Sequence, residues 1–126
     1  MKKIVQFTDL LAWQEAHKLV LLIYKLTKNF PKQEMYSLVD QMRRASSSIS
    51  ANIAEGFGRQ TYRDRIRFYY LSQGSLNEVK NFAILARDLN YLSLNDFEQV
   101  IIQANTAHQL LQGLITKSKT FITLNS

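Results

Sequence analysis

The side chains best suited to chemistry in this sequence are cations that recur between residues 59 and 87. They are Arg59, Arg63, Arg65, Arg67, Lys80 and Arg87. Arginine suits phosphate because its planar guanidinium can donate two hydrogen bonds at once. Tyr62, Tyr69 and Tyr70 lie among these cations, and tyrosine rings can stack on unpaired bases. The combination predicts a basic face that binds nucleic acid mainly through phosphate contacts.

Patterns for catalysis and metal binding are missing from the sequence. A di-iron bundle needs Glu three residues before each His, but Gln14 precedes His17 and Asn105 precedes His108. Residues 56–61 include two glycines but lack the preceding strand and the Gly-Lys-Ser/Thr ending of a phosphate loop. With no cysteine, disulfides and thiolate metal sites are excluded. We therefore expect no enzyme activity, no metal site and no cofactor.

Length and composition predict one domain, residues 1–126, with 46% apolar and 21% charged residues. The formal charge of +6 and the pI of about 9.7 favour acidic partners such as nucleic acid. No apolar run approaches the ~18 residues that a membrane-spanning helix needs. A helix lying on a membrane surface is not favoured either, because the cations do not oppose one clean apolar face. We expect a cytoplasmic protein without a targeting segment.

The apolar residues recur with helical spacing, and one proline and four glycines leave room for long elements. Three Ser/Thr-x-x-Asp starts, at residues 37–40, 61–64 and 93–96, are typical of helix N-termini. Thr8 or Asp9 is the expected start of the first helix. We predict helices at about 9–29, 36–56, 61–91 and 94–118. Their short connections predict an all-α fold, an up-down antiparallel four-helix bundle.

The second predicted helix, which contains three consecutive serines, presents a seam of mostly small residues that also includes an amide. Its members are Leu38, Met42, Ala45, Ile49, Asn52 and Gly56. The facing stripe predicted for the third helix is Phe68, Leu71, Ser75, Val79, Phe82, Ala86 and Leu89. Small residues on both sides predict a close approach of these two helices. We expect a structural polar core that fixes their register, because a buried unpaired amide costs about 1–3 kcal/mol. Its members are Asn52, Glu55, Ser75 and Glu78.

Two helices carry more apolar surface than a solitary bundle needs. The run Leu19–Tyr24 covers every side of the first helix. Outside the stripe predicted for the third helix lie Ile66, Tyr69, Tyr70, Leu76 and Ile84. Self-association would cover these residues, and closed homo-oligomers are the usual outcome. The alternative is that they belong to the core of the monomer.

The sequence resembles a known family over about residues 7–118. The resemblance is carried by QMRRA at 41–45, NIAEG at 52–56 and GSLNE at 74–78, among other strings. The family comprises proteins encoded in intervening sequences of bacterial 23S rRNA genes, also labelled S23 ribosomal proteins after the location of their genes. One departure is Ser50, where the family often has proline.

The resemblance implies a four-helix bundle that assembles as a ring-like homopentamer. A sister branch is similar to the accessory variability proteins of diversity-generating retroelements, which bind RNA and DNA through basic surfaces and partner a reverse transcriptase. The function of the family at large is unsettled.

We expect a non-enzymatic, oligomeric bundle that binds nucleic acid, with structured RNA favoured. One alternative is a ring-shaped adaptor that binds a protein partner, with its charge serving solubility. Cations at helical spacing also occur on ordinary solvated surfaces, where they pair with nearby acids such as Asp64 and Asp88.

Overall fold

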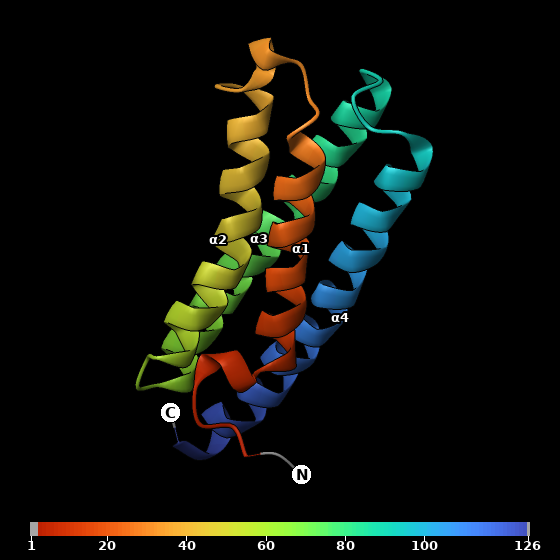
Figure 1. Cartoon of the computed structure of the whole chain (residues 1–126). Helices are drawn as coiled ribbons and strands as arrows, with labels where there is room; N and C mark the ends of the chain where they lie inside the picture. The colour runs from red at the N-terminus through yellow and green to blue at the C-terminus, as the bar shows by residue number, and fades with distance from the viewer. Residues whose placement is uncertain (1–2, 126) are drawn as a thin grey trace.

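Four long helices run alternately up and down in this computed structural model, which describes residues 3–125 and their side chains as far as Ile122 (Figure 1). The helices are α1 (Leu11–Thr27), α2 (Leu38–Phe57), α3 (Tyr62–Asp88) and α4 (Leu94–Asn125), with the short 3-10 turns η1 (Phe7–Asp9) and η2 (Lys32–Glu34). Each helix packs against its two neighbours in the cycle α1–α2–α3–α4, and within the described residues the diagonal pairs lie further apart. The predicted all-α, up-down antiparallel four-helix bundle is confirmed.

Two of the helix starts expected from the sequence are capped by side chains. The Asp64 amide donates to the Thr61 hydroxyl (3.2 Å) at the start of α3. At the start of α4 the Asp96 amide donates to the Ser93 hydroxyl (3.0 Å). The cap expected at Ser37 is wrong, because its hydroxyl donates to the Glu34 carboxylate (2.6 Å) and does not cap α2.

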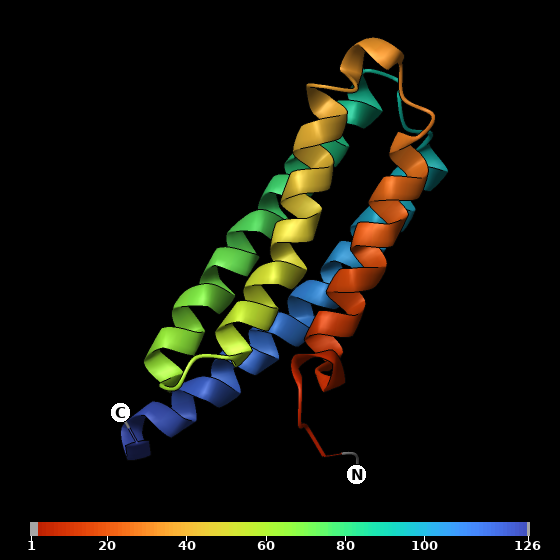
Figure 2. The same ribbon diagram turned by 60° about the vertical axis from the view of Figure 1, so that its left-hand side comes forward.

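The ends of the four helices differ from those expected. Helix α2 begins at Leu38 and ends at Phe57, within two residues of the expected ends. Helix α1 begins only at Leu11, after η1. Helix α3 ends at Asp88 because Asn90 adopts a left-handed backbone (φ 64°), after which the Tyr91 amide donates back to the Ala86 carbonyl (2.8 Å). The expected end of α4 at 118 is too early, since the helix continues to Asn125. Its last part passes below the α2–α3 connection (Figures 1 and 2).

The close approach predicted for the second and third helices is confirmed. A Cβ built on Gly56 would lie only 2.8 Å from Cε1 of Tyr69 on α3. The Ser72 hydroxyl of α3 donates directly to the Ile49 carbonyl of α2, which requires the two helices to lie close together. Around this contact the bundle core is apolar, and its largest fully buried side chains include Leu19, Ile23, Met42, Ile53, Leu76, Leu111 and Ile115.

Helix α3 is rotated relative to the stripe predicted from the sequence. Leu71 and Leu89 are 51% and 45% exposed. Three residues placed outside the stripe, Ile66, Tyr69 and Leu76, are instead buried in the monomer core. The predicted stripe is therefore confirmed at Ser75, Val79 and Ala86, which are buried, and wrong at Leu71 and Leu89. The period of a helix fixes the spacing of its buried positions but not the rotation of the helix in the bundle. Within residues 3–125, no helix is both long and apolar enough to cross a membrane.

Candidate nucleic-acid interface

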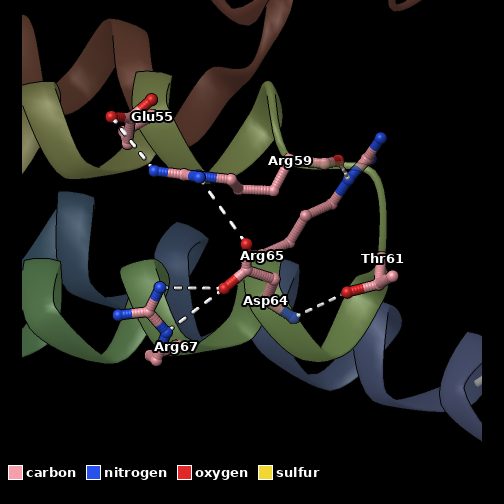
Figure 3. Close-up of polar contacts among 6 residues, drawn as sticks. All are labelled: Glu55, Arg59, Thr61, Asp64, Arg65 and Arg67. Atoms are coloured by element: carbon pink, nitrogen blue, oxygen red, sulfur yellow. Dashed lines mark hydrogen bonds and ion pairs between the residues drawn. The ribbon is translucent and has the colours of Figure 1, made fainter.

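An arginine cluster lies where α2 ends and α3 begins (Figure 3). The Arg67 guanidinium donates two hydrogen bonds to Oδ1 of Asp64, at 2.9 and 3.2 Å. The Arg59 guanidinium lies between two carboxylates, 3.4 Å from Oε1 of Glu55 and 3.7 Å from Oδ2 of Asp64. The buried Nε of Arg59 has no hydrogen bond, because 3.7 Å suffices for an ion pair but not for a hydrogen bond. These carboxylates orient Arg59 and Arg67 and neutralise part of their charge.

Two arginines of the same cluster have no carboxylate partner in the described part of the chain. Arg65 is held by other means: its Nε donates to the Arg59 carbonyl (2.8 Å), as Figure 3 shows. Its guanidinium lies over the rings of Phe57 and Tyr62, at 5.4 and 4.9 Å from their centroids. Arg63 is exposed to solvent one turn before Arg67. Both positive charges are therefore available to an anion.

The end of α4 brings two more cations to this cluster. The Phe121 ring stacks on Tyr62 with 4.8 Å between the centroids. The Lys119 ammonium lies 5.3 Å from the centroid of Tyr70. Lys117 lines a cavity together with Tyr62 and Phe121. We call this group the basic end, and its members are Arg59, Arg63, Arg65, Arg67, Lys117 and Lys119.

Lys117 and Lys119 are absent from the predicted contact residues, which all lie between residues 59 and 87. The predicted end of the last helix at residue 118 leaves out Lys119 and Phe121. One signal for a longer helix is present in the sequence. No glycine or proline follows Gly113, so nothing in the local sequence breaks the helix before Phe121.

The structure does not bring the other two predicted contact residues to the basic end. Arg87 is 20 residues after Arg67 on α3, so a rise of ~1.5 Å per residue separates their backbones by about 30 Å. Arg87 pairs with the neighbouring Asp88 (2.9 Å) and covers the ring of Phe97 on α4. The predicted cations therefore form separate groups along α3.

Lys80 forms a polar contact between α3 and α4 at the middle of the bundle. Its Nζ lies 3.2 Å from Nδ1 of His108. Burial, and secondarily the charge of Lys80, lower the pKa of His108 below its ordinary value. His108 is thus held neutral near pH 7, where its ring nitrogen can accept a hydrogen bond from Lys80.

The four residues expected to form a polar core divide into two pairs. Asn52 and Ser75 meet at Ser48: the Asn52 amide donates to the Ser48 hydroxyl (3.0 Å), and the Ser75 hydroxyl bonds to the same oxygen (3.1 Å). Glu55 and Glu78 lie on the surface instead of the interior. Glu55 pairs with Arg59, and Glu78 borders a hollow of about 280 Å³ between α2 and α3. The network that bridges α2 and α3 therefore consists of neutral side chains.

The chemistry available at the basic end is anion binding. Four arginines and two lysines supply hydrogen-bond donors for phosphate, and the Tyr62–Phe121 stack supplies aromatic surface. Within residues 3–125, no group of three or more His, Cys, Asp or Glu side chains could hold a metal ion.

Comparisons with known proteins agree with the fold. The family model for 23S rRNA-intervening sequence proteins matches residues 8–113. A crystal structure of a protein of unknown function from the S23 ribosomal protein family of Bacteroides thetaiotaomicron is similar, with a TM-score of 0.75 and 22% sequence identity. The similarity covers 83% of this chain and 98% of that one. Among curated proteins, none matches this chain. Because the family match spans most of its length, the chain belongs to the family of 23S rRNA-intervening sequence proteins.

Proposed function

We propose that this protein is a non-enzymatic oligomer that binds nucleic acid through the basic end. The observation that carries the proposal is the position of Arg63 and Arg65. Neither guanidinium has a carboxylate partner within the described residues. The Arg65 guanidinium lies over the ring of Tyr62, which stacks on Phe121, and Arg63 is exposed next to Tyr62 in the sequence. Aromatic rings beside the cations favour a ligand with unpaired bases, such as the loops of a structured RNA.

Binding at the basic end would be mainly electrostatic. Arg63, Lys117 and Lys119 are exposed and can each neutralise a phosphate. Arg59 and Arg67 are already oriented by Asp64, so less side-chain entropy is lost when they contact a backbone. The logarithm of the affinity should then fall linearly with the logarithm of the salt concentration. For a single strand the slope should be about −0.7 for each phosphate that is neutralised.

Self-association is the second part of the proposal. Leu71, Leu85 and Leu89 are 51%, 43% and 45% exposed and recur at helical spacing on one side of α3. A second copy of the chain could cover this apolar stripe. The family resemblance implies a homopentamer.

A ring-shaped adaptor is the alternative function. It is favoured by the same apolar stripe and by Tyr36, which is 93% exposed. Tyr36 lies in the α1–α2 connection, at the start of α2, whereas the basic end lies where α2 ends. A protein partner would occupy such apolar surface, and the cations would then serve solubility.

The test reverses two exposed charges of the basic end. In Arg63→Glu/Lys119→Glu we expect RNA affinity at low salt to fall roughly tenfold or more, because the field that attracts phosphate is removed. The slope of log affinity against log salt should also decrease, by about 0.7 for each phosphate of a single strand that is no longer neutralised. Fluorescence anisotropy of a labelled RNA across a salt series measures both quantities.

The matched control is Lys25→Glu/Lys32→Glu, which makes the same change in net charge at the other end of the bundle. It should retain most of the affinity. Equal losses in the two double variants would show that net charge alone attracts RNA. If the unmodified protein binds neither RNA nor DNA at low salt, the proposal is wrong and the adaptor is favoured.

A further inference from the structure

A cavity of about 420 Å³ opens at the basic end, between α2, α3, α4 and the N-terminal segment. Its size falls within the roughly 300–1,000 Å³ typical of small-ligand sites. The aliphatic part of its lining comes from Leu10 and Leu114, with Ile4 at the N-terminal side. The rings of Phe57, Tyr62 and Phe121 complete most of the wall. Such a lining suits a ligand that carries a flat apolar ring.

The charged groups on this cavity are all positive. Arg65 and Lys117 line it, and no Asp or Glu of the described residues does. The Arg65 guanidinium is fixed in place by its hydrogen bond to the Arg59 carbonyl (2.8 Å) and by the two rings beneath it. No carboxylate within residues 3–125 neutralises it. The cavity therefore combines an apolar interior with cations that can hold an anionic group.

Tyr69 adds a polar group to the lining. Its side chain is 1% exposed. Burial also raises the pKa of Tyr69 to about 12, so the hydroxyl keeps its proton and can donate to a ligand.

The stacked pair Tyr62–Phe121 supplies an aromatic platform on the same wall. Its rings are nearly parallel, at 25° with 4.8 Å between centroids. An additional planar ring can extend such a stack, and base–aromatic stacking tolerates any base because every base has a π-face.

We propose that this cavity takes one unpaired nucleotide of the bound strand, with its base against the Tyr62–Phe121 wall and its phosphate at Arg65 and Lys117. This inference rests on the proposed nucleic-acid binding and makes it more specific. A base paired inside a duplex cannot enter the cavity, so the protein selects single-stranded or looped segments over continuous duplex.

The first test compares single-stranded and duplex RNA of the same sequence by fluorescence anisotropy. We expect Phe121→Ala to weaken binding of the single strand roughly 5- to 150-fold. This is the loss of affinity expected when one base no longer stacks on an aromatic ring. Duplex affinity and the salt slope should stay unchanged, because no charge is altered. The control Tyr36→Ala removes an exposed ring at the other end of the bundle and should leave both affinities unchanged.

A second measurement needs no variant and so does not depend on the folding of Phe121→Ala. Single-stranded oligouridylate containing 4-thiouridine is photo-crosslinked to the unmodified protein, and the attached peptides are identified by mass spectrometry. We expect crosslinks at Phe57, Tyr62 or Phe121.

The outcomes separate the two proposals. Equal affinity for single strand and duplex, with crosslinks only outside the cavity, would overturn this inference and leave nucleic-acid binding intact. Absence of binding to either RNA at low salt would overturn both.

Discussion

Among single residues, Gly56 decides how closely α2 and α3 approach. A Cβ at this position would lie 3.0 Å from the Arg65 carbonyl oxygen and 3.0 Å from Cβ of Phe68, in addition to its contact with Tyr69. Two of these neighbours are backbone or Cβ atoms that cannot rotate away. The glycine is therefore required by space and not by its backbone conformation, since no glycine within the described residues has a positive φ.

Gly56→Ala should destabilise the protein by about 1–3 kcal/mol, because the added methyl group overpacks the α2–α3 contact. Gly74 provides the matched control: it also lies inside a helix, but no atom lies within 4 Å of the position that its Cβ would occupy. Gly74→Ala should stabilise by roughly 0.5–1 kcal/mol through helix propensity. Urea unfolding followed by circular dichroism measures both changes, and effects of the same sign would contradict the overpacking explanation.

Among the helices, the N-termini show which capping patterns the fold uses. Thr61 and Ser93 accept hydrogen bonds from the amides three residues later, whereas Ser37 bonds to Glu34 instead. The three sites share the Ser/Thr-x-x-Asp pattern. The pattern at Ser37 fails because η2 places a competing carboxylate next to the hydroxyl.

Thr61→Ala and Ser93→Ala should each lower the free energy of unfolding by about 0.5–2 kcal/mol, because each removes a capping acceptor. Ser37→Ala should change it by no more than about 0.5 kcal/mol, since it removes only an exposed hydrogen bond between side chains. Thermal and chemical unfolding of the three variants tests the ranking. A destabilisation at Ser37 as large as that at Thr61 would contradict it.

In the molecule as a whole, the surplus of apolar residues noted in the sequence has two destinations. Ile66, Tyr69 and Leu76 fill the monomer core. Tyr70 and Ile84 stay on the surface of α3 (44% and 43% exposed), as does Leu21 on α1 (58% exposed). Leu71, Leu85 and Leu89 of α3 are exposed as well. A stripe of this kind on a long helix is the surface that we propose for self-association.

Light scattering should give a mass that is a multiple of 14.6 kDa, five times that value for a pentamer. Leu71→Lys/Leu85→Lys should shift the mass toward that of the monomer, because it places two charges in the proposed interface. Ile102→Lys, which replaces a 66% exposed residue on α4, is the control and should keep the assembly. A monomeric mass for the unmodified protein at all concentrations would refute self-association.

The number, type and order of the helices could be predicted without the structure, because capping residues, breakers and the 3.6-residue period are local signals. Residue type and charge identified Arg59, Arg63, Arg65 and Arg67 as candidates for phosphate contacts. The helical period identified the small-residue contact around Gly56. Local signals do not determine how a helix is rotated in the bundle, and therefore the predicted stripe on α3 was displaced.

Which residues meet was settled by the packing of the helices. Phe121 and Tyr62 are far apart in sequence, and their stacking arises because α4 extends below the α2–α3 connection (Figure 2). The same packing adds Lys117 and Lys119 to the basic end and forms the cavity. These features depend on contacts between distant segments, whose geometry is set when the helices pack and not by the residues of any one helix.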